Sequence, residues 1–214
     1  SMNGIASRMG RMYRILRRVH GVYVAPPFVA ALFFVLRTIV AIGMALDPVF
    51  FPRLKKTHAR RPIVLVGNPR TGTTFLQRFL AAEGFGSGME LFLMLYPSLV
   101  LQRLLKPFLP LLEKLSPARF HSTEAHHTSL TSVETDDVAV LFRYLDGFFL
   151  YGFFLSFDEE DLMPRFDPDV RDTSERDFAW LEALWGRSLV LHGAEGNVAK
   201  LFSVSPRLPT FLER

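Results

Sequence analysis

The chain of 214 residues contains no cysteine. This absence excludes a disulfide framework, a zinc–thiolate centre and a thiol nucleophile. The sequence also lacks internal repeats and low-complexity tracts. What it does contain is a share of 49% hydrophobic residues, which is the composition of a globular protein, in a chain long enough to bury a core.

Acidic residues are nearly absent from the first part of the chain. Residues 1–61 contain eleven Arg and Lys and a single acid, Asp47, whereas residues 62–214 have a net charge of −6. A nucleic-acid-binding domain would carry its basic surface on the folded body. The acidic body therefore argues against nucleic acid as a partner.

The basic N-terminus predicts a separate helical segment over residues 1–60. Arginines recur there at helical spacing opposite apolar residues, which is the pattern of an amphipathic helix on an anionic membrane surface. They are Arg8, Arg11, Arg14, Arg17 and Arg18.

An apolar stretch, Pro26–Leu46, follows and contains one charge, Arg37. Its length fits a membrane span with the N-terminus in the cytoplasm, but a span would place Arg37 near the bilayer centre at a cost of about 2.5–3.5 kcal/mol. A helix packed on the protein or lying in the membrane interface avoids this cost. Only about fifteen residues separate the apolar stretch from the strand expected at Ile63, too few to hold a catalytic body clear of a bilayer. This short connection favours a helix that packs on the protein or lies in the membrane interface. We expect a cytoplasmic protein that meets the membrane through residues 8–46.

Lysine is missing where a nucleotide-binding loop requires it. In the stretch PIVLVGNPRTGTTFLQRFL, Gly67 and Gly72 have the spacing of the phosphate loop of ATP and GTP enzymes. That motif continues with Lys and Ser or Thr, but Thr73 and Thr74 stand here.

The surrounding pattern predicts a strand, a turn and then a helix that stops at Glu83–Gly84. Backbone N–H groups of residues 70–74 would then point outward from a helix N-terminus, where an anion is favoured. Arg70 adds a planar, permanently charged group suited to phosphate or sulfate oxygens. An ordinary tight turn is the alternative, and it explains the run PRTGTT less well.

This run resembles the 5′-phosphosulfate loop of sulfotransferases that use 3′-phosphoadenosine 5′-phosphosulfate (PAPS). The resemblance implies that the donor's 5′-phosphosulfate is bound by Asn68, Pro69, Arg70, Thr71, Gly72, Thr73 and Thr74. Arg70 takes the place of the family's charged residue, and the donor carries no triphosphate, which accounts for the missing lysine. No metal is expected.

Weaker similarities extend over residues 46–214, with the bacterial branch of the family as the nearest pattern. They imply an α/β fold with a three-layer, P-loop-type parallel sheet flanked by helices in residues 61–214. The family binds the 3′-phosphate through an Arg and a later Ser beyond a further strand. The sequence to Arg214 does not show them, so we expect this domain to be incomplete at its C-terminus.

Sulfuryl transfer needs a base for the acceptor hydroxyl. Glu90 follows a glycine-rich turn that should bring it back towards the loop, and the resemblance implies a glutamate base at about this place. A helix-start acid is the alternative. His126 and His127 are the second choice, because the family's cytosolic branch uses a histidine.

Three further segments carry structural expectations. Glu134, Asp136 and Asp137 are interpreted as a capped, solvated helix start. A second amphipathic helix is expected to end at Gly186. The Leu- and Phe-rich segments are interpreted mainly as core, with an apolar pocket for a lipid-like or aromatic alcohol as an additional reading.

The sequence therefore predicts a sulfotransferase that acts on a hydroxyl compound, either a small molecule, a lipid or a glycan. Two alternatives stay open. A P-loop kinase or NTPase variant requires a displaced lysine near the loop, for which Lys55, Lys56 and Lys200 are the candidates. A non-catalytic, membrane-associated protein with a sulfotransferase-like body is the other. The pattern does not predict an oligomeric state.

Overall fold

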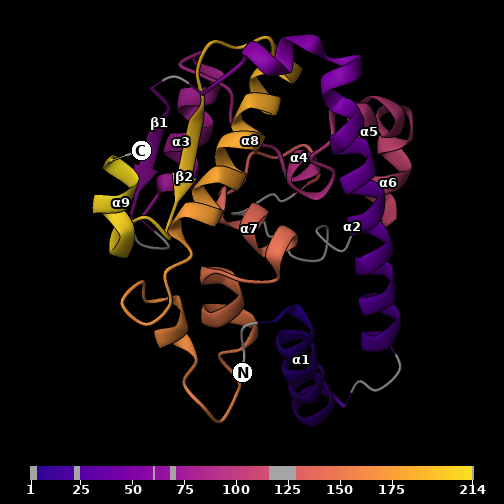
Figure 1. Cartoon of the computed structure of the whole chain (residues 1–214), viewed down its shortest axis with the longest axis vertical. Coiled ribbons are helices and arrows are strands. Elements are labelled where there is room, and N and C mark those ends of the chain that lie inside the picture. The colour runs from indigo at the N-terminus through magenta and orange to yellow at the C-terminus, as the bar shows by residue number, and fades with distance from the viewer. Residues whose placement is uncertain (1–3, 22–24, 60, 68–70, 116–128, 214) are drawn as a thin grey trace.

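The computed structural model describes residues 4–21, 25–59, 61–67, 71–115 and 129–213. These residues form a helix-rich α/β fold with a small parallel sheet. The long helix α2 runs along one flank, the sheet lies near the opposite side, and α8 stands between them (Figure 1). The helices are α1 (Ile5–His20), α2 (Ala25–Phe50), α3 (Thr73–Ala82), α4 (Leu91–Leu95), α5 (Leu99–Leu105), α6 (Leu109–Leu115), α7 (Asp137–Tyr144), α8 (Ser174–His192) and α9 (Leu208–Leu212). Short 3-10 turns are η1 (Pro52–Lys56), η2 (Lys106–Phe108), η5 (Met163–Phe166) and η6 (Ser205–Arg207), and η4 (Leu150–Phe154) is a π-helix.

The sheet consists of β1 (Ile63–Val66) and β2 (Val198–Leu201), which run parallel with Val64 opposite Ala199. The strand expected at residue 63 and the helix expected after the loop are both confirmed. The sheet is narrower than predicted, because the described residues contain these two strands and one additional parallel bridge, from Ser87 to Asn197.

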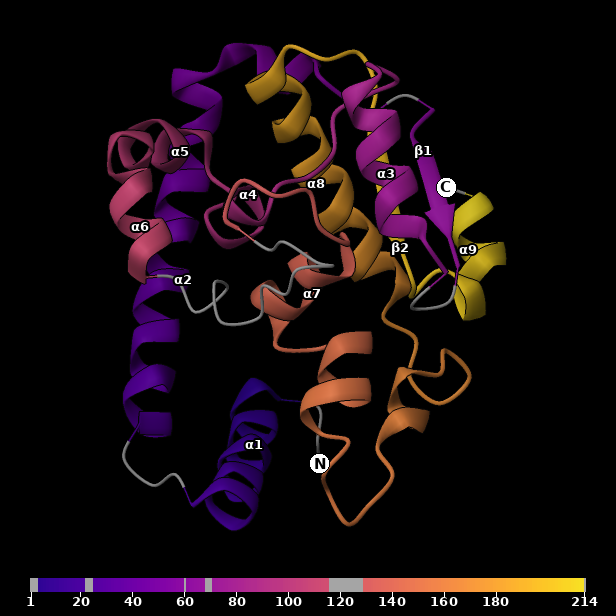
Figure 2. The same ribbon diagram turned by 180° about the vertical axis from the view of Figure 1, so that it is seen from behind.

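The two faces of β2 meet different helices, because side chains alternate along a strand. Ala199 and Leu201 are buried in the main core with Leu181, Leu184 and Trp185 of α8. On the other face, α3 packs against β2 and lies in front of it in Figure 2. The sheet is thus covered by a helix on each side.

Helix α8 does not end at Gly186, as the sequence predicted, but continues to His192. It ends at Gly193, whose φ of 64° is the left-handed conformation that suits glycine. Gly186 has another role: a Cβ there would lie 3.2 Å from the carbonyl oxygen of Thr57. The small residue permits a close approach of η1 and its flanking chain to α8.

The Leu- and Phe-rich segments are helical but interrupted. Pro97 and Pro107 separate α4, α5 and α6, in keeping with the missing N–H of proline. Helix α7 ends at Tyr144. The next residue, Leu145, has a left-handed φ of 46°, and the π-helix η4 follows. These segments therefore form several short helices, whose buried Leu and Phe residues belong to the core, as expected.

Helix α1 is bound to the body through its arginines. Arg8 is buried and donates to the carbonyl oxygens of Tyr144 and Leu145, 3.9 Å from the carboxylate of Asp146. Arg11 pairs with Asp158 and Glu160, and Arg18 pairs with Glu159. Two of the five arginines of the basic face therefore pair with an acidic loop and Arg8 is buried, whereas Arg14 and Arg17 stay exposed.

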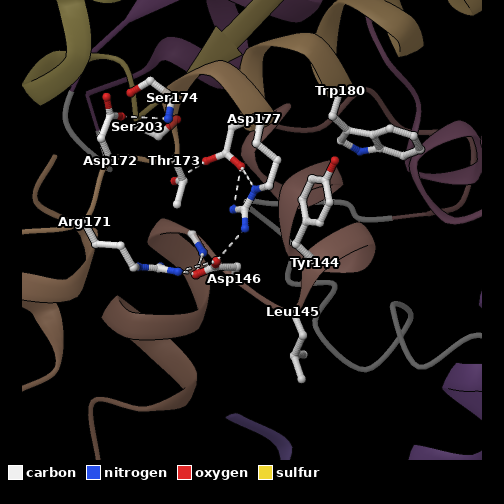
Figure 3. A network of polar contacts seen from close by, with 12 residues as sticks. Tyr144, Leu145, Asp146, Arg171, Asp172, Thr173, Ser174, Asp177, Trp180 and Ser203 are labelled. Atoms are coloured by element: carbon white, nitrogen blue, oxygen red, sulfur yellow. Dashed lines mark hydrogen bonds and ion pairs between the residues drawn. The ribbon is translucent and has the colours of Figure 1, made fainter. Parts of the chain in front are cut away.

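Asp146 lies at the centre of a network of ion pairs, and its own side chain is fully buried (Figure 3). Its carboxylate accepts hydrogen bonds from Arg171 at 2.7 and 3.0 Å and from Arg176 at 3.0 Å. Arg176 also pairs with Asp177, which in turn binds Arg207 at 2.8 Å. The charges link α1, the chain after α7, α8 and η6.

Candidate functional site

The described ends of the loop between β1 and α3 are Gly67 and the residues from Thr71 onward. Gly72 is the residue before α3, and its φ of 80° is left-handed. A side chain at this position would strain the backbone. A Cβ at Gly67 would lie 3.2 Å from Cγ2 of Thr73, so the start and end of the turn lie close together.

Three of the predicted donor-binding residues, Asn68, Pro69 and Arg70, lie outside the described residues. Thr71 is exposed, and Thr73 and Thr74 are half-buried in the first turn of α3. The first N–H groups of a helix have no partner within it and carry the positive end of its dipole. The described part of the turn therefore places hydrogen-bond donors, both backbone N–H groups and threonine hydroxyls, together at the N-terminus of α3.

Lys200 brings a positive charge to this turn. It lies on β2, its side chain is buried, and its Nζ donates to Oγ1 of Thr74 across 2.5 Å. Burial lowers the pKa of Lys200, and nearby Arg78 acts in the same direction, while Glu134, Asp136 and Asp137 oppose the shift. An anion at the helix start would meet this buried cation.

The sequence showed Lys200 only as one of three lysines that a kinase reading would need. The sequence feature that could have identified Lys200 is a charged residue within the apolar strand VAKL, which is buried throughout. Because side chains alternate along a strand, Lys200 points to the face opposite Ala199 and Leu201. The pairing of β1 with β2 then sets Lys200 beside Leu65, two residues before the turn.

Two buried carboxylates fix the end of β2. Asp136 accepts from the backbone N–H of Lys200 at 2.6 Å, and Asp137 accepts from those of Phe202 and Ser203. Burial raises the pKa of both carboxyls, that of Asp136 to about 7. The predicted helix start is confirmed, because α7 begins at Asp137, but the predicted solvation was wrong for this pair: both carboxylates are buried and bind backbone N–H groups at the end of β2.

Side chains of α3 connect the turn to the same elements. Gln77 is fully buried and donates to the carbonyl oxygen of Val198 at 3.2 Å. Arg78 pairs with Glu134 at 2.9 Å and donates to the carbonyl oxygen of Val133. These contacts hold the helix whose first turn forms the candidate site.

Glu90 is the residue before α4 and is half-buried. Burial raises its pKa, and the positive groups of His192 and Lys106 partly offset this effect. It lines two cavities, of about 830 and 650 Å³, and His192 lines both of them. Neither cavity is lined by the described loop residues. His126 and His127 lie outside the described residues.

The larger of these cavities is mainly apolar, with cations at its wall. Phe50, Phe92 and Leu99 contribute apolar surface, and Arg103 and Lys106 contribute charge. Within the described residues no group of three or more His, Asp or Glu side chains is placed to hold a metal.

No protein-family model matches this chain, and no curated protein sequence matches it. A solved structure does: the sulfotransferase STF1 from Mycobacterium tuberculosis H37Rv. The similarity covers 97% of this chain with a TM-score of 0.59 and 19% sequence identity. The chain spans 57% of the length of that structure's chain. At this identity the similarity concerns the fold: the chain has a sulfotransferase-like α/β fold.

Proposed function

We propose that this protein is a sulfotransferase that moves a sulfuryl group from PAPS to a hydroxyl acceptor. One observation carries the proposal: in a sulfotransferase-like fold, the loop PRTGTT begins a helix whose Thr74 is met by the buried cation of Lys200. An anion-binding turn with its cation supplied from the neighbouring strand fits a donor with a single 5′-phosphosulfate.

The described residues fit the donor at its 5′ end. The amides of the first turn of α3, with the hydroxyls of Thr73 and Thr74, would hold the 5′-phosphate. Lys200 would neutralise the charge on its oxygens, and Arg70 would do so from the loop. PAPS supplies the activated sulfuryl group when bound. The proposal requires no metal ion.

Glu90 is proposed as the base that takes the proton of the acceptor hydroxyl on a carboxylate oxygen. Its raised pKa brings it nearer to working pH, which favours proton transfer. The adjoining apolar cavity favours a lipid-like alcohol over a free sugar as acceptor. His126 and His127 remain the second choice for this role.

Isothermal calorimetry with the desulfated donor, 3′-phosphoadenosine 5′-phosphate, tests the donor site in the whole chain. We expect binding that needs no magnesium and that is lost or weakened at least tenfold in Arg70→Ala. Thr71→Ala is a milder comparison, because it removes a neutral hydroxyl from the same loop. No heat of binding in a folded wild-type protein would contradict the proposal.

A P-loop kinase or NTPase is the second candidate, and Lys200 is the specific observation in its favour. A displaced lysine does reach the loop, as that reading requires. Magnesium would also need a carboxylate, but of the three acids near Lys200, Glu134 pairs with Arg78, and Asp136 and Asp137 accept hydrogen bonds from backbone amides. The same calorimetry with ATP, with and without magnesium, distinguishes the two: magnesium-dependent ATP binding favours the kinase.

The wider three-layer sheet of P-loop proteins is part of the proposal. Its support is the outer strand β1, where Ile63 and Val66 are exposed apolar side chains. Further strands beside β1 would cover them. A non-catalytic protein on the same fold is the remaining reading, and it predicts no sulfuryl transfer to any hydroxyl compound.

A further inference from the structure

Helix α2 exposes an apolar face along its whole length. From Pro27 to Phe50 it is long and apolar enough to cross a membrane, by length and composition, with a mean hydropathy of 2.3. Most of this segment is not covered by the described protein. The apolar stripe, as we call the exposed set, consists of Phe28, Leu32, Val35, Ile39, Ile42, Leu46 and Val49, which are 41–70% exposed.

The exposed surface is wider than a seam for a single partner helix. Ala31, Phe34, Ala41 and Ala45 are also exposed beside the stripe. At about 100° per residue the exposed positions cover about half the circumference of the helix. A coiled-coil seam is narrower and is flanked by charged residues, which this face lacks.

Both charges of α2 turn towards the protein. Arg37 donates to the carbonyl oxygen of Arg143 and lies over the ring of Phe33. Asp47 is fully buried, where it accepts from Ser98 and pairs with Arg187 at 2.9 Å. Both charged side chains of α2 thus lie on the face that packs against the protein, and the outer face carries no charge.

The inner face also keeps α2 from leaving the body to cross a bilayer. A Cβ at Gly43 would lie 2.7 Å from Oγ of Ser98 and 2.9 Å from Cγ of Leu101, so side chains at the start of α5 pack directly on the backbone of α2. Separating them would leave Asp47 and Arg187 without their partners in a buried position, which is strongly unfavourable. Because α2 stays attached to the body of the protein, it can present its outer face to a membrane only when its axis lies parallel to the membrane surface.

Cations flank both ends of α2. Arg14 and Arg17 are exposed on α1, which packs against the first turns of α2, and Arg53, Lys55 and Lys56 are exposed on η1 at the other end. A second copy of the chain packed on the stripe, in either orientation, would bring these cations together. Anionic lipid headgroups would instead neutralise them.

An apolar cavity of about 410 Å³ opens between α1 and α2. Met12, Leu16, Val29 and Phe33 are among its lining residues, and none of the lining residues is charged. The first turns of α2 contribute both to this cavity and to the end of the apolar stripe, so the two apolar surfaces adjoin. A lipid acyl chain could enter the cavity at this point.

We propose that α2 lies in the plane of an anionic membrane with the apolar stripe in the lipid interface. The binding surface is the stripe together with the cations at its two ends. This orientation differs from a span, and it uses none of the residues of the candidate donor site, so it can be tested separately from donor binding.

Flotation with phosphatidylcholine vesicles containing phosphatidylglycerol tests the surface. We expect wild-type protein to float, and the double variant Val35→Glu/Ile42→Glu to partition at least about tenfold less. Val170→Glu is the matched control, because Val170 is 63% exposed in a loop away from α2. The triple variant Arg53→Gln/Lys55→Gln/Lys56→Gln should lose about fivefold per charge, and only on anionic vesicles.

Depth measurements separate an in-plane helix from a span. The chain has no cysteine, so Phe28→Cys, Ile39→Cys and Val49→Cys each give one site for a fluorophore. Quenching by brominated lipids should place all three at the same shallow depth. A deep Ile39 with shallow ends would overturn the in-plane orientation, since it is the profile of a span.

Failure of wild-type protein to bind anionic vesicles would overturn the proposal. A concentration-dependent dimer that Val35→Glu/Ile42→Glu converts to a monomer would also overturn it and would assign the stripe to a second copy. Arg70→Ala should leave vesicle binding unchanged, so loss of the donor site and loss of the membrane surface are observed separately.

Discussion

Lys200 on β2 lies with its Nζ 2.5 Å from Oγ1 of Thr74 on α3, although 126 residues separate them in sequence. The contact delivers a buried cation to the N-terminus of the helix that follows the loop. Burial lowers the pKa of Lys200, while the nearby Glu134, Asp136 and Asp137 act in the opposite direction. Donor binding should therefore depend on this residue.

Lys200→Met removes the charge and keeps most of the side-chain volume. We expect affinity for 3′-phosphoadenosine 5′-phosphate to fall about 10- to 150-fold, the loss of one charge-assisted hydrogen bond, with little change in the free energy of unfolding. Calorimetry and urea unfolding measure the two quantities. Lys114→Met, at an exposed position on α6, is the control. Unchanged affinity in Lys200→Met would remove Lys200 from the site.

The pH dependence of 3′-phosphoadenosine 5′-phosphate binding should also reveal the role of Lys200. The pKa of Lys200 is below its usual value in the free protein, so alkaline solution deprotonates it early, whereas a bound anion would restore the proton. Affinity should fall as pH rises towards the usual lysine range, with proton uptake on binding. In Lys200→Arg the fall should move to higher pH, because guanidinium stays charged.

Gly72→Ala and Gly84→Ala form a matched pair at the two ends of α3. Both glycines have a φ of 80°, and a Cβ at either position meets no atom within 4 Å. Each substitution should lower the free energy of unfolding by about 1–2 kcal/mol through backbone strain alone. Only Gly72→Ala should also weaken binding of 3′-phosphoadenosine 5′-phosphate. Equal affinities in the two variants would separate the turn from donor binding.

Glu90→Gln tests the proposed base. With PAPS as donor and 1-decanol as probe acceptor, we expect kcat to fall about 10²- to 10⁴-fold while affinity for 3′-phosphoadenosine 5′-phosphate stays unchanged. The wild-type rate should fall as pH drops through the raised pKa of Glu90, because the base must be ionised. Glu83→Gln, exposed at the end of α3, is the control. A Glu90→Gln enzyme with full kcat would assign the residue a structural role.

Asp146→Asn should destabilise the protein by about 3–5 kcal/mol, because Arg8, Arg171 and Arg176 would lose their buried counter-charge. The arginines hold the pKa of Asp146 well below its usual value, so its contribution is present above about pH 4 and is lost as pH falls. Urea unfolding at pH 7 and at pH 3 measures both effects. Asp169→Asn, at an exposed position, should behave as wild type.

Asp136 gives the opposite pH dependence. Burial raises its folded-state pKa to about 7, so its contribution to stability is complete below its unfolded value near 4 and is lost as pH rises through 7. Between pH 5 and 7 this group should lower the free energy of unfolding by up to about 1.4 kcal/mol per pH unit. Asp136→Asn should lack this slope, whereas a slope equal to wild type would assign the effect to other groups.

The sequence by itself determined the local elements: the strand at Ile63–Val66, the turn at Gly72 and the helix that ends before Gly84. These depend on β-branched runs, on glycine at a positive φ and on helix periodicity, all of which act over a few neighbouring residues. The expectation that the loop binds an anion has the same local origin, whereas the identity of the donor rests on the resemblance to sulfotransferases.

Only the tertiary structure decided which distant charges meet. It brought Lys200 to Thr74, buried Asp136 and Asp137 against the end of β2, and paired the arginines of α1 with an acidic loop. A charge has no periodicity that reveals its partner, since Coulomb energy depends on separation and burial in space. A close approach between distant segments is equally invisible in sequence. Gly186 was therefore interpreted as the end of a helix, whereas the nearby backbone of Thr57 accounts for the small residue at this position.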